Sequence, residues 1–320
     1  MGSSFYELVG SITLLFFVAW ILLKLAKGIW TCYLGSALGF GVKWLPGPDT
    51  WAVVTGATDG IGLAYAKEFA KMGYCVCLIS RNKDKLEKTK SEMQASYPKC
   101  NSIKTVAVDF TKADIYDQIQ EQIDDLDVHV LVNNVGISYE YPEYYTKIPN
   151  SKTLINSIMN CNLMSIMRMI DMVLSKMERK NRGIIINISS FSASCPMPLL
   201  SLYAASKVYV DFLSRALNLE YQDKGIFIQS VLPAYVSTNM SKIRKSSFMV
   251  PSPTTFVQHA LKTVGIENRT YGYWTHKLLG FVTDRIIINF LSQDFSSKLA
   301  YDSLKNVRRR YYKKEGIKMD

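Results

Sequence analysis

Between Trp51 and Met72 the chain has an apolar stretch, a glycine-rich turn and a helix-forming stretch, and this order constrains the fold more than any other feature. Gly56, Gly60 and Gly62 give the turn the spacing Gly-x-x-x-Gly-x-Gly. Glycine suits backbone that has a positive φ or passes close to a ligand, and the first turn of a helix offers free N–H groups to a phosphate. The segment therefore predicts the first βα unit of a dinucleotide-binding α/β fold, and a tight turn without a ligand is the alternative.

Further short apolar stretches predict the other strands of the sheet. They alternate with longer helix-forming stretches, which is the pattern of a doubly wound, mostly parallel, Rossmann-type α/β sheet. Asp109 and Asn134 lie at the ends of two of these stretches. Ligands bind at the carboxyl ends of the strands in such sheets, so we expect both side chains near the cofactor. The predicted strands after the first are residues 74–80, 103–108, 128–132, 183–188 and 227–232.

Basic residues follow the second predicted strand. Arg81 comes directly after it, and Lys83 and Lys85 are close behind. A protein that prefers NAD usually has a carboxylate at this place, which binds the ribose 2′-hydroxyl. Cations there favour a 2′-phosphate instead, so NADP(H) is the predicted cofactor. An exposed helix of mixed charge is the alternative explanation for the basic run.

Tyr203 and Lys207 lie four residues apart in a stretch that predicts a helix from 201 to 221. Residues at this spacing share a helix face. A nearby ammonium group favours phenolate, and we therefore expect Lys207 to lower the pKa of Tyr203 and make the phenol an acid–base catalyst. Taken alone, the pair is also explained by a solvated helix surface.

In their order and approximate spacing, these motifs resemble those of the short-chain dehydrogenase/reductase family. The resemblance extends from about residue 51 to residue 238, most of the chain. It implies an oxidoreductase that interconverts a keto and a hydroxyl group with NADP(H). The motifs that carry it are Thr-Gly-Ala-Thr-Asp-Gly-Ile-Gly at 55–62, Asp109, Asn-Asn-Val-Gly at 133–136, Asn162, Ser190, Tyr203 and Lys207.

The resemblance implies a role for each of four catalytic residues. Tyr203 is expected to protonate the substrate carbonyl oxygen, and Lys207 to hold the nicotinamide ribose. Ser190 is expected to bind the substrate oxygen, with Ser189 as the alternative because neighbouring strand residues face opposite ways. Asn162 is expected to hold a water that connects Lys207 to bulk solvent; by itself it would be an ordinary polar residue of a helix.

The chain departs from the family pattern after the last predicted strand. Many members have Pro-Gly there, whereas this chain has Pro233-Ala234, so we expect the loop to take a different path. Thr238 remains a candidate to bind the nicotinamide carboxamide. The residues that the resemblance assigns to the cofactor are Gly56, Thr58, Asp59, Gly60, Ile61, Gly62, Arg81, Lys85, Asp109, Asn134, Tyr203, Lys207, Val236 and Thr238.

Four other stretches, residues 138–144, 242–245, 251–253 and 262–265, are similar to a membrane-bound branch of the family. That branch implies a lipid-like substrate: a long-chain or very-long-chain 3-oxoacyl-CoA of fatty-acid elongation, or a 17-ketosteroid. Lys242, Arg244 and Lys245 mildly favour the acyl-CoA because its phosphates can pair with cations, although exposed cations can also serve solubility alone. A catalytically silent membrane scaffold of the same fold is the third alternative.

Residues Leu8 to Leu23 carry no charge and predict a membrane anchor. Through Ala26 the helix would be about 28 Å long, near the thickness of a bilayer core. No positively charged segment precedes the stretch, so an uncleaved anchor is favoured over a signal peptide, and a buried helix is the alternative. Glu7 precedes it and Lys24 and Lys27 follow it, which places the catalytic domain in the cytosol. The resemblance implies the endoplasmic reticulum membrane.

These features divide the chain into an anchor and linker at 1–47, a catalytic domain at 48–300 with a substrate-loop insertion at about 238–292, and a basic tail at 301–320. The tail holds much of the net charge of +11 and suits anionic headgroups; no nucleic-acid recognition motif accompanies it. Residues 278–291 predict an amphipathic helix that lies on the membrane or covers the substrate pocket.

Six scattered cysteines fit a reducing compartment, and three histidines make a histidine-rich metal site improbable, so we predict no metal. The predicted helices at 150–177 and 201–221 have apolar faces wide enough for a homodimer interface.

Overall fold

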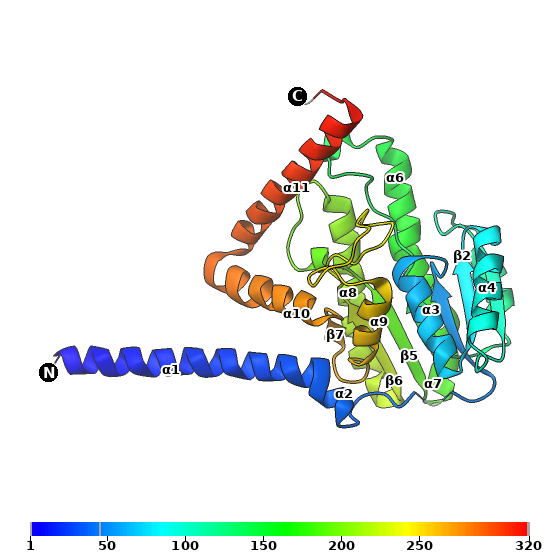
Figure 1. Cartoon of the computed structure of the whole chain (residues 1–320), viewed down its shortest axis with the longest axis horizontal. Coiled ribbons are helices and arrows are strands. Elements are labelled where there is room, and N and C mark those ends of the chain that lie inside the picture. Colours follow the sequence, from blue (N-terminus) through cyan, green and yellow to red (C-terminus); the bar gives the residue numbers. More distant parts are fainter. Residues whose placement is uncertain (1, 45, 319–320) are drawn as a thin grey trace.

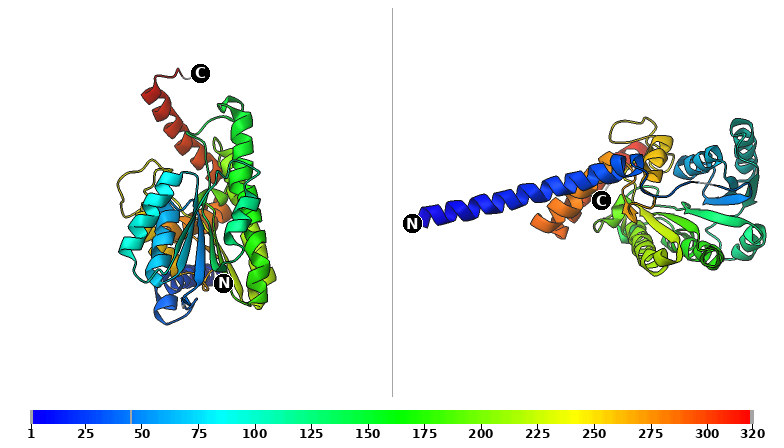
Figure 2. Two further views of the ribbon diagram at one scale, coloured as in Figure 1. Left: turned by 90° about the vertical axis from the view of Figure 1, so that its right-hand side faces the viewer. Right: turned by 90° about the horizontal axis from the view of Figure 1, so that it is seen from below.

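A computed structural model describes residues 2–44 and 46–318. Its centre is a seven-stranded, all-parallel sheet with the strand order β3-β2-β1-β4-β5-β6-β7 (Figures 1 and 2). The doubly wound Rossmann-type sheet predicted from the sequence is confirmed. The strands are β1 (Thr50–Thr55), β2 (Cys75–Ser80), β3 (Ile103–Ala107), β4 (Asp127–Asn133), β5 (Gly183–Ile188), β6 (Ile226–Val231) and β7 (Arg269–Thr270).

Helices cover both faces of this sheet (Figure 2). Because alternate strand residues point to opposite faces, Ala52 and Val54 pack in one core and Val53 in the other. The first core is closed by α3 (Gly60–Met72), α4 (Lys83–Ser96) and α9 (Pro253–Leu261). The second is closed by α5 (Tyr116–Ile123), α7 (Ser165–Arg179) and α8 (Ser201–Tyr221).

The order of the strands fixes where a ligand can bind. β1 pairs with β2 on one side and with β4 on the other. The chain adds β2 and β3 on one side of β1 and then returns to add β4 to β7 on the other side. This is the topological switch point, where open α/β sheets bind ligands beyond the carboxyl ends of the strands. The glycine-rich turn follows β1 at this point.

The long helix predicted at 150–177 is divided in the structure. It consists of α6 (Ser151–Ile158), a π-helical segment (Met159–Met164) and α7. Such π segments widen a helix locally and often occur at functional sites. Asn162 lies inside this one and is completely buried. The apolar periodicity of the sequence does not distinguish a π segment from an α-helix.

The N-terminal helix α1 (Gly2–Ile29) projects away from the sheet domain (Figure 1). Within the described residues, Ser4–Ile29 is the one stretch long and apolar enough to cross a membrane, and none of the residues in its most apolar part is buried. A π segment (Trp30–Leu34) and the short α2 (Gly35–Ala37) lead from it to β1.

Two helices after β7 form a hairpin on the same side of the molecule as α1 (Figures 1 and 2). The first consists of α10 (Trp274–Phe281) and a π-helical segment (Val282–Leu291), and the second is α11 (Gln293–Glu315). Most of the basic segment predicted as a tail is helical and belongs to α11. Arg308 and Tyr312 of this segment are buried against Glu143, a contact between residues far apart in sequence.

Candidate active site

The glycine-rich turn brings backbone close to backbone. Gly56 and Gly60 have φ values of +64° and +54°, which favour glycine. A Cβ atom on Gly62 would lie 2.3 Å from the carbonyl oxygen of Gly56, so only glycine fits there without a shift of the turn. The carboxylate of Asp59 caps α3 by accepting from the Gly60 N–H at 2.7 Å. The turn therefore holds the N-terminus of α3 open toward the switch point.

The end of β4 braces this turn from the other side. The side-chain amide of Asn134 donates to the carbonyl oxygens of Thr55 (3.0 Å) and Gly56 (3.3 Å). In return, the Thr55 hydroxyl oxygen accepts from the backbone N–H groups of Asn134 and Val135. Thr55 was not among the predicted site residues. Its place as the last residue of β1, directly before the first glycine, was the available signal.

The residues predicted to recognise the adenosine end lie after β2 and β3. Thr58 hydrogen-bonds the hydroxyl of Ser80 at 2.8 Å, and the next residue, Arg81, is exposed. Partial burial raises the pKa of Asp109, but hydrogen bonds from Thr111 and the charge of Arg81 bring it below its ordinary value overall. Arg81 and Asp109 are therefore electrostatic neighbours at one edge of the switch point.

Lys85 and Ile61 lie at the same edge, each in the first turn of a helix. Lys85 is exposed in the first turn of α4, where its backbone N–H is capped by Asn82. Ile61 is half-buried in the first turn of α3, where it packs against the core beneath the glycine turn.

Tyr203, Lys207 and Ser190 meet beyond the end of β5. The Ser190 hydroxyl hydrogen-bonds the Tyr203 phenol and accepts from the Ser192 N–H at 3.1 Å. The Lys207 ammonium lies 5.8 Å from the centre of the Tyr203 ring and donates to the Ile188 carbonyl at 2.9 Å. Ser189, the alternative to Ser190, points away and donates to the Lys207 carbonyl at 2.7 Å. Ser190 is the serine that the structure brings to Tyr203.

The expected lowering of the Tyr203 pKa is wrong. Burial raises the pKa of Tyr203, the hydrogen bond from Ser190 lowers it only in part, and the net pKa lies above the ordinary value. Burial also lowers the pKa of Lys207 to about 8. Spacing along a helix shows that two groups are neighbours, but it does not show how deeply the phenol is buried. A raised pKa keeps the phenol protonated at neutral pH, which suits a proton donor.

Asn162 contacts this group from the π segment. Its amide oxygen accepts from the Ile137 N–H (2.8 Å), and its amide nitrogen donates to the Ile137 carbonyl (3.0 Å) and to the Ser206 hydroxyl (2.9 Å). It therefore ties the loop after β4 to α8. Gly136 lies between it and the lysine: a Cβ there would be 3.2 Å from the Lys207 nitrogen and 3.5 Å from the Asn162 oxygen.

The loop after β6 closes the site from a third side. Asn239 donates to the Asp59 carboxylate at 2.7 Å, and the Thr238 methyl would lie 3.1 Å from a Cβ on Gly60. Val236 is buried, and its carbonyl accepts from the Ser241 hydroxyl at 2.6 Å. Asn239 was not predicted, because its partner is 180 residues away.

A buried histidine supports the Pro-Ala departure in this loop. The Ala234 N–H donates to His276 Nδ1 at 3.3 Å, and His276 Nε2 lies 3.3 Å from the Met249 carbonyl. Burial lowers the pKa of His276 to about 4, so the ring is neutral and can accept one bond and donate the other.

Tyr139 is a further residue that the sequence did not assign to the site. The N-cap residue of α8, Leu200, offers no side-chain cap. The phenol oxygen of Tyr139 instead accepts from the Leu202 N–H at 3.1 Å and lies 3.5 Å from the Ser201 hydroxyl. A residue after β4 thus caps the helix that carries Tyr203.

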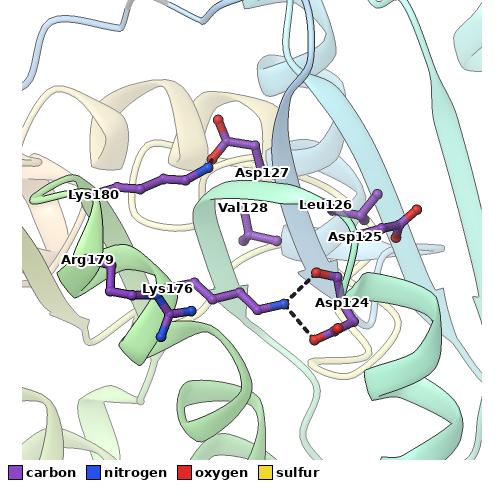
Figure 3. A pocket seen from close by; sticks show the side chains of 8 residues that line it. All are labelled: Asp124, Asp125, Leu126, Asp127, Val128, Lys176, Arg179 and Lys180. Atoms are coloured by element: carbon purple, nitrogen blue, oxygen red, sulfur yellow. Dashed lines mark hydrogen bonds and ion pairs between the residues drawn. The ribbon is translucent and has the colours of Figure 1, made fainter.

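A hollow of about 250 Å³ lies at the N-terminal end of β4, the end away from the switch point (Figure 3). Lys176 pairs there with Asp124 at 2.6 Å, and Lys180 with Asp127 at 2.7 Å. The cations and carboxylates neutralise one another, and the hollow lies away from the switch point. It plays no part in the site described above.

The residues at the switch point fit a dinucleotide. The turn around Gly56 and Gly62 leaves no room for a Cβ, and the N-terminus of α3 suits a pyrophosphate. Asn134 lies against the glycine turn and Lys207 lies beside Tyr203, and these residues would hold a nicotinamide ribose. A nicotinamide cofactor supplies or accepts the hydride, and the polar side chains of this chain position it and handle the proton.

The chain is similar to known dehydrogenases and reductases. Residues 50–247 match the family model of short chain dehydrogenases. The very-long-chain 3-oxoacyl-CoA reductase of Homo sapiens is 44% identical over 301 residues, 93% of each chain. Among solved structures, a short-chain dehydrogenase from Sphingobium yanoikuyae in complex with NADPH has a TM-score of 0.58 at 26% identity, covering 66% of this chain and 81% of the other. A ketone-specific alcohol dehydrogenase from Comamonas testosteroni has a TM-score of 0.60 at 26% identity, covering 69% and 85%.

The fold and the site thus define an oxidoreductase that acts on keto and hydroxyl groups with a nicotinamide cofactor. The chain belongs to the short-chain dehydrogenase family.

Proposed function

We propose that the chain uses NADPH to reduce the 3-keto group of a long-chain or very-long-chain 3-oxoacyl-CoA to a hydroxyl group. The observation that carries this proposal is the Tyr203–Ser190 hydrogen bond beside the buried Lys207, at the carboxyl ends of the strands. Relatives such as the Homo sapiens very-long-chain 3-oxoacyl-CoA reductase, similar over nearly the whole chain, support the substrate class.

The proposed roles follow from the contacts of each side chain. Tyr203, held protonated by its raised pKa, gives its proton to the substrate oxygen, and Ser190 donates a hydrogen bond to the same oxygen. Lys207 holds the nicotinamide ribose, and Asn162 fixes the backbone around Ile137 beside it. Asn162 thus supports the site through protein contacts, and a water on its oxygen remains part of the proposal.

The loop between β6 and α9 favours an acyl-CoA over a steroid. Lys242, Arg244 and Lys245 are exposed on it, together with the apolar side chains of Met240 and Phe248. Cations can pair with the phosphates of coenzyme A, which a steroid lacks. The 17-ketosteroid therefore remains the second candidate substrate, supported only by the apolar part of the loop.

A comparison of the two substrate classes tests this proposal. Purified chain should oxidise NADPH in the presence of a long-chain 3-oxoacyl-CoA, as followed by cofactor absorbance, and should turn over androstenedione or estrone far more slowly. Faster turnover of the steroids would replace the acyl-CoA proposal by the steroid one.

We predict that Arg81→Ala weakens the binding of NADPH but not that of NADH. Loss of one charge-assisted bond to a 2′-phosphate should raise the KM for NADPH on the order of 10- to 100-fold while leaving NADH nearly unchanged. Lys88→Ala is the matched control, since Lys88 is exposed on the neighbouring helix α4. Equal losses for NADPH and NADH would contradict a role of Arg81 at the 2′-phosphate.

We also propose that α1 anchors the chain in the endoplasmic reticulum membrane with the sheet domain in the cytosol. Its exposed apolar surface and the order of Glu7, Lys24 and Lys27 support this orientation. Exposed Phe212 and Leu219 on α8 support a homodimer through that helix.

A further inference from the structure

The first arm of the hairpin after β7, formed by α10 and the following π segment, runs beside the N-terminal helix, whereas α11 turns away from it (Figure 1). At the base of this arm, the Lys277 ammonium bonds the Thr31 hydroxyl, just beyond α1, and pairs with Glu267 at 2.6 Å. Further out, the ring of Phe281 lies 6.0 Å from that of Trp20. At the tip, Phe290 lies 5.8 Å from Phe17. The first arm therefore follows α1 from its base to its middle.

The hairpin and α1 also share an exposed apolar surface. Exposed apolar side chains of this extent mark an interaction surface in a soluble or peripheral protein. Here they are continuous with a helix whose own apolar surface is mostly exposed and long enough to cross a bilayer. The exposed apolar residues of the hairpin are Leu278, Leu279, Ile286, Phe290, Leu291, Phe295, Leu299 and Val307.

The position of Phe290 along α1 gives its depth. Lys24 marks the expected edge of the hydrocarbon, and Phe17 lies about 10 Å further along the helix, at about 1.5 Å per residue. A side chain in contact with Phe17 would therefore sit well inside a hydrocarbon core of about 30 Å. Arg285, Asp294 and Lys298 near the tip are exposed and charged, and these charges prevent the hairpin from crossing the whole bilayer.

We propose that this hairpin is a second membrane-inserted element, which enters one leaflet beside α1 and turns back. The proposal rests on α1 being a membrane anchor, and its partner is the lipid bilayer. α10 also carries His276, which accepts from the Ala234 N–H. Insertion of the hairpin therefore holds the loop after β6, and with it the side of the candidate active site that faces the substrate, at the membrane surface.

Fluorophore-labelled cysteine variants of the full chain test this insertion. Phe290→Cys, Leu15→Cys and Lys88→Cys each replace an exposed side chain, on the hairpin, on α1 and on α4 respectively. Each is labelled with an environment-sensitive fluorophore and reconstituted into phosphatidylcholine vesicles that contain lipids spin-labelled on the acyl chain. The unsubstituted chain, treated in parallel, gives the background from native cysteines, and NADPH binding shows that each variant is folded.

The label at residue 290 should shift to the blue and lose more than about half of its emission to the spin label, whereas the label at residue 88 should change little. Spin labels near the headgroup should quench residue 290 more than residue 15. If residue 15 is quenched and residue 290 is not, the hairpin does not insert while the anchor stands. If neither is quenched, both proposals fall. A blue-shifted label at residue 290 without lipid quenching would mean a protein contact and would also overturn the proposal.

Discussion

Replacing Tyr203 by phenylalanine is expected to lower the rate of keto reduction by about 10²- to 10⁴-fold, the usual contribution of a positioned general acid. The substitution removes only the hydroxyl group that Ser190 bonds. Hydride arriving at the carbonyl carbon leaves negative charge on the oxygen, and phenylalanine has no proton to neutralise it. Turnover with a 3-oxoacyl-CoA and NADPH measures the effect as a fall in kcat.

The control is Tyr209→Phe, which removes a hydroxyl from the same helix two turns away. It should leave kcat within about twofold of the unsubstituted chain. NADPH should still quench the tryptophan fluorescence of Tyr203→Phe, because the glycine turn is unaffected. Unchanged turnover in Tyr203→Phe would contradict the proposed mechanism, whereas loss of NADPH binding would indicate a folding defect instead.

The sheet and the cofactor turn were predictable because their signals are local. A buried parallel strand appears in the sequence as a short apolar run. Glycine is required at position 62 because a Cβ there would clash with the carbonyl oxygen of Gly56, six residues earlier. The first and last residues of β5 and α8 are the same as those predicted from the sequence. The two-residue strand β7 was not predicted, since it is too short to leave a periodic pattern.

The contacts that close the site were less predictable because they join distant parts of the chain. Nothing near Asn239 indicates that its partner is Asp59, and nothing near Tyr139 indicates that it caps α8. The pKa of Tyr203 depends on burial by the surrounding elements, which no spacing along one helix records. Local patterns thus predicted which residues form the proposed catalytic group. The protonation state and orientation of their side chains depend on tertiary packing.

One such distant contact joins the C-terminal helix α11 to Glu143, in the loop after β4. Arg308, 6% exposed, donates to Glu143, 2% exposed, at 2.7 Å, and to the Tyr312 hydroxyl at 2.9 Å. The Tyr312 hydroxyl in turn bonds the second carboxylate oxygen of Glu143. The Glu143 N–H donates to the Leu199 carbonyl at 2.9 Å, just before α8. Through Glu143, α11 is thus linked to the start of the helix that carries Tyr203.

Breaking this buried pair should destabilise the fold strongly. Arg308→Met leaves the Glu143 carboxylate without its cation, and removing one partner of a buried pair typically costs about 3–5 kcal/mol. Arg309→Met and Arg310→Met are matched controls, because both side chains are exposed on the same helix, and each should change stability by no more than about 0.5 kcal/mol. Denaturant unfolding in detergent, followed by tryptophan fluorescence, measures the three free energies.

The double variant Glu143→Met/Arg308→Met separates the charge from the packing. Burial of two charges is itself costly, so removing both should restore much of the stability that Arg308→Met loses. Because Glu143 also accepts from the Tyr144 N–H at 2.7 Å and from Tyr312, recovery should be incomplete. If Arg308→Met costs no more than Arg309→Met, the contact between Arg308 and Glu143 does not stabilise the fold.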